Sequence, residues 1–441
     1  MKKRLFKRVA LLACSVLAFS NAACLLTGET LLAKPVAATE LSWEQQKDET
    51  LVAYREKVQE FAAKFTAETY KTYAREDNFS VSPVSVFMAL SLAAECADGQ
   101  TRDEILTALG VTYEEVKNNT ATLFRSLTSQ TQTKTVFGEK TTERLQLSNS
   151  IWLDDAFSAN SECAEDLANY YYCYSYQADF VNNNKGANAA IRKFVKQQTD
   201  GVIDQDFALN DQTAFALMNT LYLKDTWLDD GTKLPLTQEK YDFTDKENLV
   251  KSLQLLRPNY IQGNVFKGED FTSFYARTYR GYRLKFILPD EGYTIDEVFT
   301  RENILLANSV KDYGATDHVN KIHYHTRCLF PQFDATYDGD TRATLENAFG
   351  VKSMFNKQDA DFTKLSADKP LFCNSVRHVT KLKVDRVGIE GAAVTLIPGA
   401  GAPGPDEYEN VYQDFVVDKT FGFILTDLYD TPLFVGVINN V

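Results

Sequence analysis

The chain has 441 residues, of which 44% are apolar and 24% are charged, and its formal net charge is -13 at pH 7. This composition predicts a soluble globular protein of one large or two ordinary domains and excludes low-complexity and repeat architectures. The acidic balance argues against nucleic acid as a partner.

The N-terminus has the pattern of an export signal. Five basic residues lie within positions 1–8, an apolar run follows from Val9 to Phe19, and small residues stand at Ala22 and Ala23. The apolar run is too short to span a membrane permanently. We therefore expect residues 1–23 to be a removable signal peptide, and its loss of five basic and no acidic residues takes the net charge from -13 to -18.

Cys24 directly follows Asn21, Ala22 and Ala23, an arrangement that resembles the lipobox of bacterial lipoproteins. Two outcomes are open at this point. Either the chain is lipidated at Cys24 and anchored to the outer face of the bacterial cell membrane, or it is cleaved after Ala22 or Ala23 and secreted.

The later cysteines are an odd, scattered set without metal-ligand spacing. We expect buried thiols rather than a disulfide framework at these positions, which are Cys96, Cys163, Cys173, Cys328 and Cys373.

Residues 24–48 have the composition of a linker, and helical spacing begins after them. One face of the first expected helix is apolar, at Leu51, Tyr54, Val58, Phe61, Ala62 and Phe65. Ser82 and Pro83 then form an N-cap with proline at the first helical position. The following stretch, Val84 to Ala94, is apolar almost all round, which predicts a buried helix.

A further helix is predicted around Ile105 to Leu109, with Thr101 and Glu104 as its capping box and Gly110 as its stop. Strands are expected later in the chain. Leu145 to Leu153 alternates in polarity, and Ala214 to Leu223 is apolar on both faces, as in a central strand covered from both sides. Helices early and strands late predict an α+β fold.

Five motifs occur in one order between residues 49 and 441, and together they resemble the serpin family. They are Asn78–Ser85 at the start of the buried helix, Asn219–Trp227 matching Asn-x-x-x-Phe-Lys-Gly-x-Trp on the third strand of the main sheet, His378 ten residues before Gly388, Phe415–Phe421 matching the C-terminal signature, and Pro432–Gly436 matching the closing strand.

The resemblance implies a single domain over residues 49–441, with three β-sheets, eight or nine helices and an exposed reactive-centre loop from Gly388 to about Val417. It also implies an irreversible suicide-substrate inhibitor that works as a monomer. A target serine or cysteine protease would cut the loop and form an acyl-enzyme, and the loop would insert as a new central strand before deacylation. Such a protein contributes no catalytic residue and needs no cofactor.

The resemblance places the loop hinge in a run of small residues. At the strand period of two, its uncharged face begins with Ile389, Gly391, Ala393 and Thr395, so the run could enter a packed sheet. Inhibitory members usually carry Thr or Ser where Ile389 stands, and Pro398 would lose one ladder bond on insertion. The full hinge is Gly388, Ile389, Glu390, Gly391, Ala392, Ala393, Val394 and Thr395.

The resemblance also places Ser82, Ser85, Asn219 and His378 in a polar cluster under the opening seam of the main sheet, with Trp227 at its upper end. The alternative interpretation is a set of ordinary satisfied core residues.

Two positions are open for the cleaved bond. Counting from Gly388 leads to the small residues at Ala400, Gly401, Ala402 and Pro403, which suit a protease with a small primary pocket. Counting back from the C-terminal signature leads to about Glu409, because the loop is longer than usual. We favour the small residues.

Motifs for other functions are weak. Gly399–Gly404 fits a dinucleotide-binding pattern but precedes proline and acids rather than a helix. Asp334 and Asp338 only partly match a calcium loop, and His323 and His325 are more often ordinary residues than metal ligands. We therefore expect no metal or cofactor, and the common hydrolase motifs are absent from the sequence.

Two functions of different classes are thus open. One is protease inhibition by a secreted or lipid-anchored protein. The other is a non-inhibitory surface binding module of the same fold, whose loop is cleaved without inserting.

Overall fold

The computed structural model describes residues 29–73, 77–128, 132–136, 139–227, 233–310, 313–368, 370–374, 376–390 and 408–441, with the backbone alone for 132–136 and 139–142. Its ten α-helices exceed the expected eight or nine because two of them, α2 and α9, have only four residues. The helices are α2 (Trp43–Gln46), α3 (Glu49–Thr72), α4 (Pro83–Cys96), α5 (Gly99–Leu109), α6 (Tyr113–Ser126), α7 (Ser161–Tyr171), α8 (Asn184–Gln198), α9 (Ile295–Val298), α10 (Arg301–Ser309) and α11 (Arg342–Phe349).

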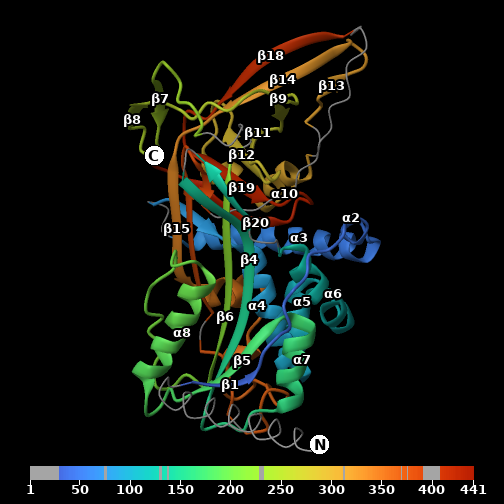
Figure 1. The fold of residues 1–441 in the computed structure, drawn as a ribbon, viewed down its shortest axis with the longest axis vertical. Coiled ribbons are helices and arrows are strands. Elements are labelled where there is room, and N and C mark those ends of the chain that lie inside the picture. Colours follow the sequence, from blue (N-terminus) through green and yellow to red (C-terminus); the bar gives the residue numbers. More distant parts are fainter. Residues whose placement is uncertain are drawn as a thin grey trace, which may run out of the picture.

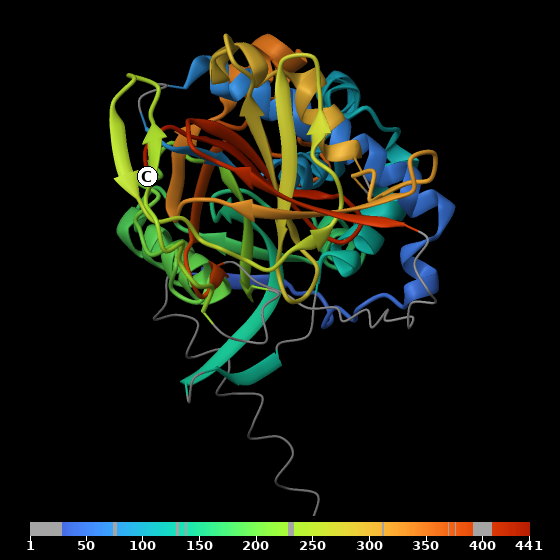
Figure 2. The same ribbon diagram turned by 90° about the horizontal axis from the view of Figure 1, so that it is seen from above.

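The main sheet runs along the long axis of the molecule (Figure 1). Its strand order is β1-β5-β4-β6-β17-β16-β15, so strands distant in sequence lie side by side. The bounds are β1 (Glu29–Ala33), β4 (Glu139–Asp154), β5 (Cys173–Ala178), β6 (Phe215–Thr226), β15 (Phe333–Asp340), β16 (Arg377–Val384) and β17 (Gly388–Glu390). A short strand, β3 (Gln132–Val136), pairs with the start of β4, and Figure 2 shows this pair projecting from the body.

A second group of strands continues from β15 in the order β2-β20-β19-β12-β11-β10. Its bounds are β2 (Phe79–Val81), β10 (Phe266–Lys267), β11 (Phe271–Arg277), β12 (Arg283–Pro289), β19 (Phe421–Thr426) and β20 (Pro432–Ile438). A third sheet joins β9 (Ile261–Gln262), β13 (Thr316–Asp317), β14 (Ile322–Leu329) and β18 (Glu409–Val416), and β7 (Tyr241–Thr244) pairs with β8 (Val250–Leu253). The chain is therefore α+β, as predicted.

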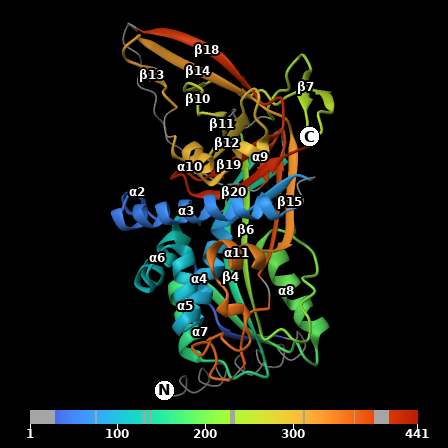
Figure 3. The same cartoon turned by 180° about the vertical axis from the view of Figure 1, so that it is seen from behind.

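The main sheet separates two hydrophobic cores. Alternate residues of β4 face opposite sides, so Leu145, Leu147 and Ile151 pack in the large core that contains α4, whereas Trp152 packs with Phe194 of α8. Figure 3 shows helices α4 to α7 gathered below α3 on one side of the molecule. A sheet covered on both faces explains why β6 carries apolar residues on both faces between Phe215 and Leu223.

The first helices follow the predicted pattern, with one change at a cap. All six apolar positions predicted for the face of α3 are buried, and every residue of α4 is buried. Ser82 is the N-cap of α4, but its hydroxyl makes no capping bond and lies 2.9 Å from the Ser85 hydroxyl.

The predicted capping box of α5 is wrong. The helix begins earlier, after Asp98, whose side chain accepts a bond from the N–H of Gly99, so Thr101 lies inside the first turns. Glu104 instead accepts bonds from the N–H groups of Lys352 (2.8 Å) and Ser353 (2.7 Å) at the start of the short helix η1 (Ser353–Phe355). Gly110 ends α5 in the left-handed conformation, as expected.

The segment expected to be a linker carries secondary structure where the structure describes it. β1 pairs antiparallel with β5 at the edge of the main sheet, and α2 is closed by a capping box between Ser42 and Gln45. An edge strand with free backbone groups can recruit a short, weakly patterned segment, which explains why composition alone did not reveal β1.

Two further expectations concern single features. The five later cysteines are buried and free of disulfide bonds, as predicted. Among the described helices, none is long and apolar enough to cross a membrane.

Candidate functional site at the base of the loop

The start of the predicted hinge is a short strand inside the main sheet. β17 pairs antiparallel with β6 through Gly388–Thr226 and Ile389–Asp225, and with β16 through Ile389–Val384. The Ile389 side chain is 1% exposed and packs in the core, whereas Glu390 points outward and pairs with Lys224 at 2.9 Å. Within β17, Ile389 therefore faces the core and Glu390 faces outward.

Gly388 is required by a close approach of two backbones. A Cβ atom at this position would lie 1.8 Å from the carbonyl oxygen of Asp225. Its N–H and that of Val387 both point to the Asp385 carboxylate, at 3.3 Å and 2.7 Å, which closes the turn before β17.

Trp227 holds the same turn from the other side. Its side chain is 1% exposed, and its indole N–H donates to the carbonyl of Asp385 at 2.7 Å. Arg386, which stands where the family carries an acid, donates from Nε to the carbonyl of Leu234 at 2.9 Å. Trp227 thus lies at the end of the sheet where the loop begins, the position expected for it.

Below β17 the main sheet contains a seam, by which we mean the facing edges of β6 and β16. Among the described strands, both edges pair with β17 but not with each other. β6 extends from Phe215 to Lys224 along this seam, and β16 extends from Arg377 to Leu382. The backbone groups on both edges can therefore accept another strand.

The four predicted polar residues meet at the seam. Ser82, Ser85, Asn219 and His378 line one narrow cavity of about 20 Å³ between β6 and β16. The backbone N–H of Ser82 donates to Nε2 of His378 at 3.0 Å, and burial lowers the pKa of His378 to about 4. Asn219 donates to Oδ1 of Asn149 at 2.5 Å, while its own buried Oδ1 has no hydrogen-bond partner within the described chain.

A cluster of buried ionisable side chains lies at the end of the seam where β17 pairs with β6, and the sequence analysis missed it. Asp225, Glu143 and Arg280 have exposures of 3%, 1% and 1%, and Arg280 Nε lies 3.7 Å from Glu143 Oε2. The Asp225 carboxylate accepts bonds from the N–H groups of Thr226 (2.8 Å) and Arg280 (3.2 Å). Burial raises the pKa of Asp225 to about 8, and the nearby Glu143 carboxylate adds to the rise.

A signal for this cluster was present in the sequence. The third-strand motif has glycine where Asp225 stands, so the motif match itself marked an added carboxyl group. Glu143 and Arg280 lie far from it in the chain and carried no pattern, because only the fold brings them together.

The far end of the loop is fixed in the third sheet. β18 pairs in parallel with β14 over eight residue pairs, from Ile322–Glu409 to Leu329–Val416. His323 stacks on Tyr408 and His325 stacks on Tyr412, with ring centroids 4.6 Å and 4.8 Å apart. These histidines therefore take part in cross-strand ring contacts.

The remaining loop predictions lie outside the described residues. They concern the hinge from Gly391 to Thr395, the cleavage positions Ala400, Gly401, Ala402 and Pro403, and the dinucleotide-like pattern Gly399–Gly404. Cys24 also lies outside them. Glu409, the other cleavage position considered, is the first residue of β18.

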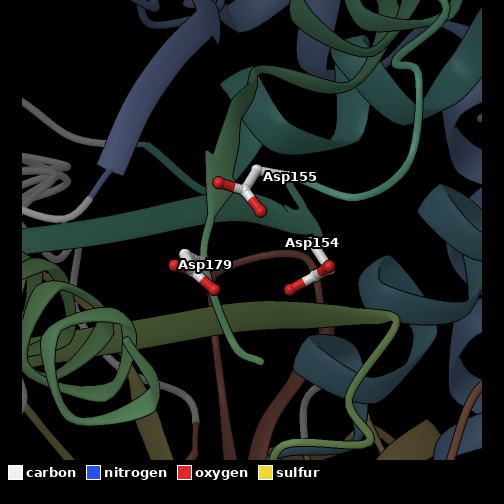
Figure 4. Close-up of side chains that lie close together, drawn as sticks. All are labelled: Asp154, Asp155 and Asp179. Atoms are coloured by element: carbon white, nitrogen blue, oxygen red, sulfur yellow. The ribbon is translucent and has the colours of Figure 1, made fainter. Parts of the chain in front are cut away.

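Candidate metal ligands have other partners. Asp338 of the partial calcium pattern lies on β15 and binds Arg377 at 2.8 Å. Among the described residues, a group of three possible ligand oxygens within 4.8 Å of one another occurs at Asp154, Asp155 and Asp179 (Figure 4).

Two carboxylates of this acidic group accept backbone hydrogen bonds. Asp154 accepts bonds from the N–H groups of Ala156 (3.1 Å) and Phe180 (2.8 Å), and Asp179 accepts one from Asn182 (2.6 Å). Asp155 is exposed, and exposed acidic groups are common without an ion, so we assign no ion to the three.

Comparisons with known proteins agree with this geometry. The sequence model "Serpin (serine protease inhibitor)" matches residues 56–441. The chain is 25% identical to alpha-1-antiproteinase of Callosciurus caniceps over 400 residues, which cover 86% of this chain and 87% of that protein.

Solved structures show the same fold. The native state of the thermophilic serpin tengpin has a TM-score of 0.67 at 21% identity, covering 93% of this chain and 97% of that one. Thyroxine-binding globulin in complex with thyroxine has a TM-score of 0.69 at 19% identity, covering 88% and 98%. The hinge strand in the main sheet, the seam and the family match over most of the chain establish that this protein belongs to the serpin family.

Proposed function

We propose that this protein inhibits an extracellular serine or cysteine protease irreversibly, by inserting its cleaved loop into the seam between β6 and β16. It acts as a suicide substrate and a monomer: the protease forms an acyl-enzyme with the loop, and insertion of the loop displaces the protease before water can release it. The inhibitor itself supplies no catalytic residue and no cofactor.

The observation that carries this proposal is the register of β17. Extending its pairing down the seam places Gly391 to Leu396 opposite Leu223 to Met218 on β6 and opposite Leu382 to Arg377 on β16. The odd-numbered residues on the core side are then small or uncharged, because they continue the face begun by Ile389.

The same register gives Thr395 a specific environment. In the inserted state Thr395 would lie opposite Asn219 on β6 and His378 on β16, at the level of the polar cluster. The Thr395 hydroxyl could then donate to Oδ1 of Asn219, the buried acceptor that has no described partner. Insertion would thus complete the hydrogen bonding of the seam.

The register also limits the free-energy cost of inserting Pro398, which cannot donate a backbone hydrogen bond to the sheet. In the inserted state Pro398 would lie opposite Ala216 on β6 but beyond Arg377, the first residue of β16. Proline has no backbone N–H, so one carbonyl group of the neighbouring strand would lose its hydrogen bond. This carbonyl group would lie at the very end of the inserted strand, where water can bind to it.

Cleavage at the small residues Ala400 to Pro403 would leave this whole segment on the N-terminal side of the cut. We favour these positions over Glu409, because Glu409 already belongs to β18. From the signal-like N-terminus we further propose that the inhibitor acts outside a bacterial cell, either secreted or anchored through Cys24 to the outer face of the cell membrane.

A second function is a binding module with a loop that is cut but not inserted. Ile389 favours it as a departure in sequence, because inhibitory members of the family usually carry Thr or Ser at this position. A related fold, thyroxine-binding globulin, was solved with thyroxine, so this alternative belongs in the same test.

The experiment is a panel of elastase-like, subtilisin-like, trypsin-like and papain-like proteases analysed on denaturing gels. Inhibition predicts a covalent band at the summed mass, and N-terminal sequencing of the released C-terminal fragment gives the cleaved bond.

Ala393→Arg should abolish the band while cleavage continues, because residue 393 faces the core in the inserted register. Ala392→Arg is the matched control and should keep the band, because residue 392 faces outward. Cleavage without any covalent band would favour the binding module.

A further inference from the structure

A cavity of about 130 Å³ lies apart from the seam, between the N-terminal segment, the end of α6, β4 and the turn that joins β19 to β20. Three aromatic rings line it, from Trp43, Tyr282 and Tyr429, together with the carboxyl groups of Glu40 and Asp427. Within the described chain, no lysine, arginine or histidine side chain lines it. The lining is therefore aromatic and acidic.

Asp427 is the buried acid of this cavity, with 5% of its surface exposed. Its Oδ1 atom accepts bonds from the N–H groups of Tyr429 (2.9 Å) and Thr431 (2.8 Å). Its Oδ2 atom has no hydrogen-bond partner among the described residues. A buried carboxylate oxygen without a partner is costly, so an occupant that donates to it would stabilise the fold.

Arg55 is a positive charge that acts on Asp427, and its Nη donors have other partners. Nη1 donates to the carbonyl of Gln46 at 2.7 Å, and Nη2 donates to the Ser126 hydroxyl at 2.6 Å, whereas the buried Nε has no hydrogen-bond partner among the described residues. Burial lowers the pKa of Arg55, and the Asp427 carboxylate opposes this effect, so the two charges sense each other without a direct bond.

Negative groups belong to the lining of the cavity, whereas positive groups of the protein lie around it. The carboxyl groups of Glu40 and Asp427 line it together with the three rings. Lys47 Nζ lies 4.1 Å from the Trp43 centroid and Arg55 Cζ lies 4.3 Å from the Tyr429 centroid. These contacts show that both rings can receive a cation, so the lining itself suits a positive occupant.

We propose that this cavity binds a small alkylammonium cation between Asp427 and the rings of Trp43, Tyr282 and Tyr429, with its N–H group donating to the Asp427 Oδ2 atom. Aromatic rings beside a carboxylate are a general means of recognising such groups. The volume suits a ligand somewhat smaller than benzene, which fills an engineered cavity of about 150 Å³. The rival occupant is water, since the same volume holds about four molecules at about 30 Å³ each.

The test is calorimetric titration of the full chain with ethylammonium and isopropylammonium, and with tert-butanol as a neutral ligand of similar shape. The cations should bind saturably at one site, and tert-butanol should bind about tenfold more weakly or not at all. Absence of cation binding, or equal binding of tert-butanol, would overturn the proposal and leave a hydrated cavity.

Three variants locate the site. Asp427→Asn keeps an oxygen for the two backbone donors but removes the charge, and it should weaken cation binding about tenfold. Trp43→Ala removes a ring that is 49% exposed, so it should fold normally and weaken binding even if the first variant does not fold. Asp103→Asn, exposed on α5, is the control and should bind like the wild type. Unchanged affinity in both cavity variants would overturn the proposal, and none of these outcomes depends on whether the loop inserts.

Discussion

Ile389 and Asp225 face each other across the β17–β6 pair, and their side chains are 1% and 3% exposed. An apolar loop residue and a carboxyl group thus meet where the loop enters the main sheet. Because burial raises the pKa of Asp225 to about 8, this carboxyl group is mostly protonated at neutral pH. The entry point of the loop is therefore sensitive to pH.

Asp225 should make the native state less stable as the pH rises. Its pKa is about 8 in the folded protein and about 3.9 in an unfolded chain, so the folded protein holds a proton that the unfolded chain has released. The free energy of unfolding then falls between about pH 4 and pH 8. Asp225→Asn removes this pH dependence. In urea unfolding, the free energy of unfolding of the variant should therefore rise relative to that of the wild type by at least about 1 kcal/mol from pH 5 to pH 8.

The control for this prediction is Asp103→Asn, an exposed change on α5. Its difference from the wild type should stay constant over the same pH range. If Asp225→Asn behaves in the same way, Asp225 is ionised in the folded protein and the prediction is wrong.

His378 should act in the opposite direction and at lower pH. Burial lowers its pKa to about 4 from an unfolded value near 6.5, so the unfolded chain binds a proton that the folded protein does not. Stability is then fully present above about pH 6.5 and is lost progressively toward pH 4. His378→Gln keeps an acceptor for the Ser82 N–H but cannot titrate. In urea unfolding, its free energy of unfolding should therefore decrease less from pH 7 to pH 4 than that of the wild type. An unchanged slope would contradict the prediction.

Thr395→Val should weaken the inserted state alone. The variant keeps the shape of the side chain but loses the hydroxyl that the register brings to Asn219. Once the loop is cleaved, unfolding should cost about 1 kcal/mol less than in the cleaved wild type, while the intact proteins should match. Leu396→Val, on the outward face, is the control for side-chain volume. Equal losses in the intact and cleaved proteins would argue against the register.

Gly388→Ala should disturb the loop base before any cleavage. The added Cβ would meet the Asp225 carbonyl at 1.8 Å, a backbone contact that no side-chain rotation relieves. We expect the intact protein to lose about 1–3 kcal/mol of stability. Val387→Ala, which adds no atom beside β6, should cost less in the same thermal unfolding experiment. An intact Gly388→Ala protein as stable as the wild type would show that β17 does not pair as described.

Local patterns predicted much of the helical part of the chain. The face of α3 and the buried helix α4 were correct because periodic apolar residues settle these structures locally. The capping box at Thr101 was wrong because Asp98 offered an earlier cap and Glu104 found partners on η1, which is distant in sequence. Cap choice therefore depended on tertiary contacts that a local pattern does not contain.

The candidate site was likewise predictable only in part. Motif order was enough to bring Ser82, Asn219 and His378 to one seam, because each belongs to a recognisable segment. The partnership of Asp225 with Glu143 and Arg280 was not predictable, since it joins three elements with no shared spacing. The pairing of β17 with both β6 and β16 was likewise a matter of sheet order, which follows from packing across the whole chain.

The central claim is that the cut loop becomes a strand in the seam, and the thermal midpoint before and after cleavage tests it most directly. A protease that nicks the chain between Gly388 and Val417 should raise the Tm by more than about 20 °C, because about 1 kcal/mol moves the Tm of a large domain by only a few degrees and a full strand adds several hydrogen bonds. Ala393→Arg should be nicked without this rise. A nicked wild-type protein that melts at the temperature of the intact protein would contradict loop insertion and the inhibitory function that depends on it.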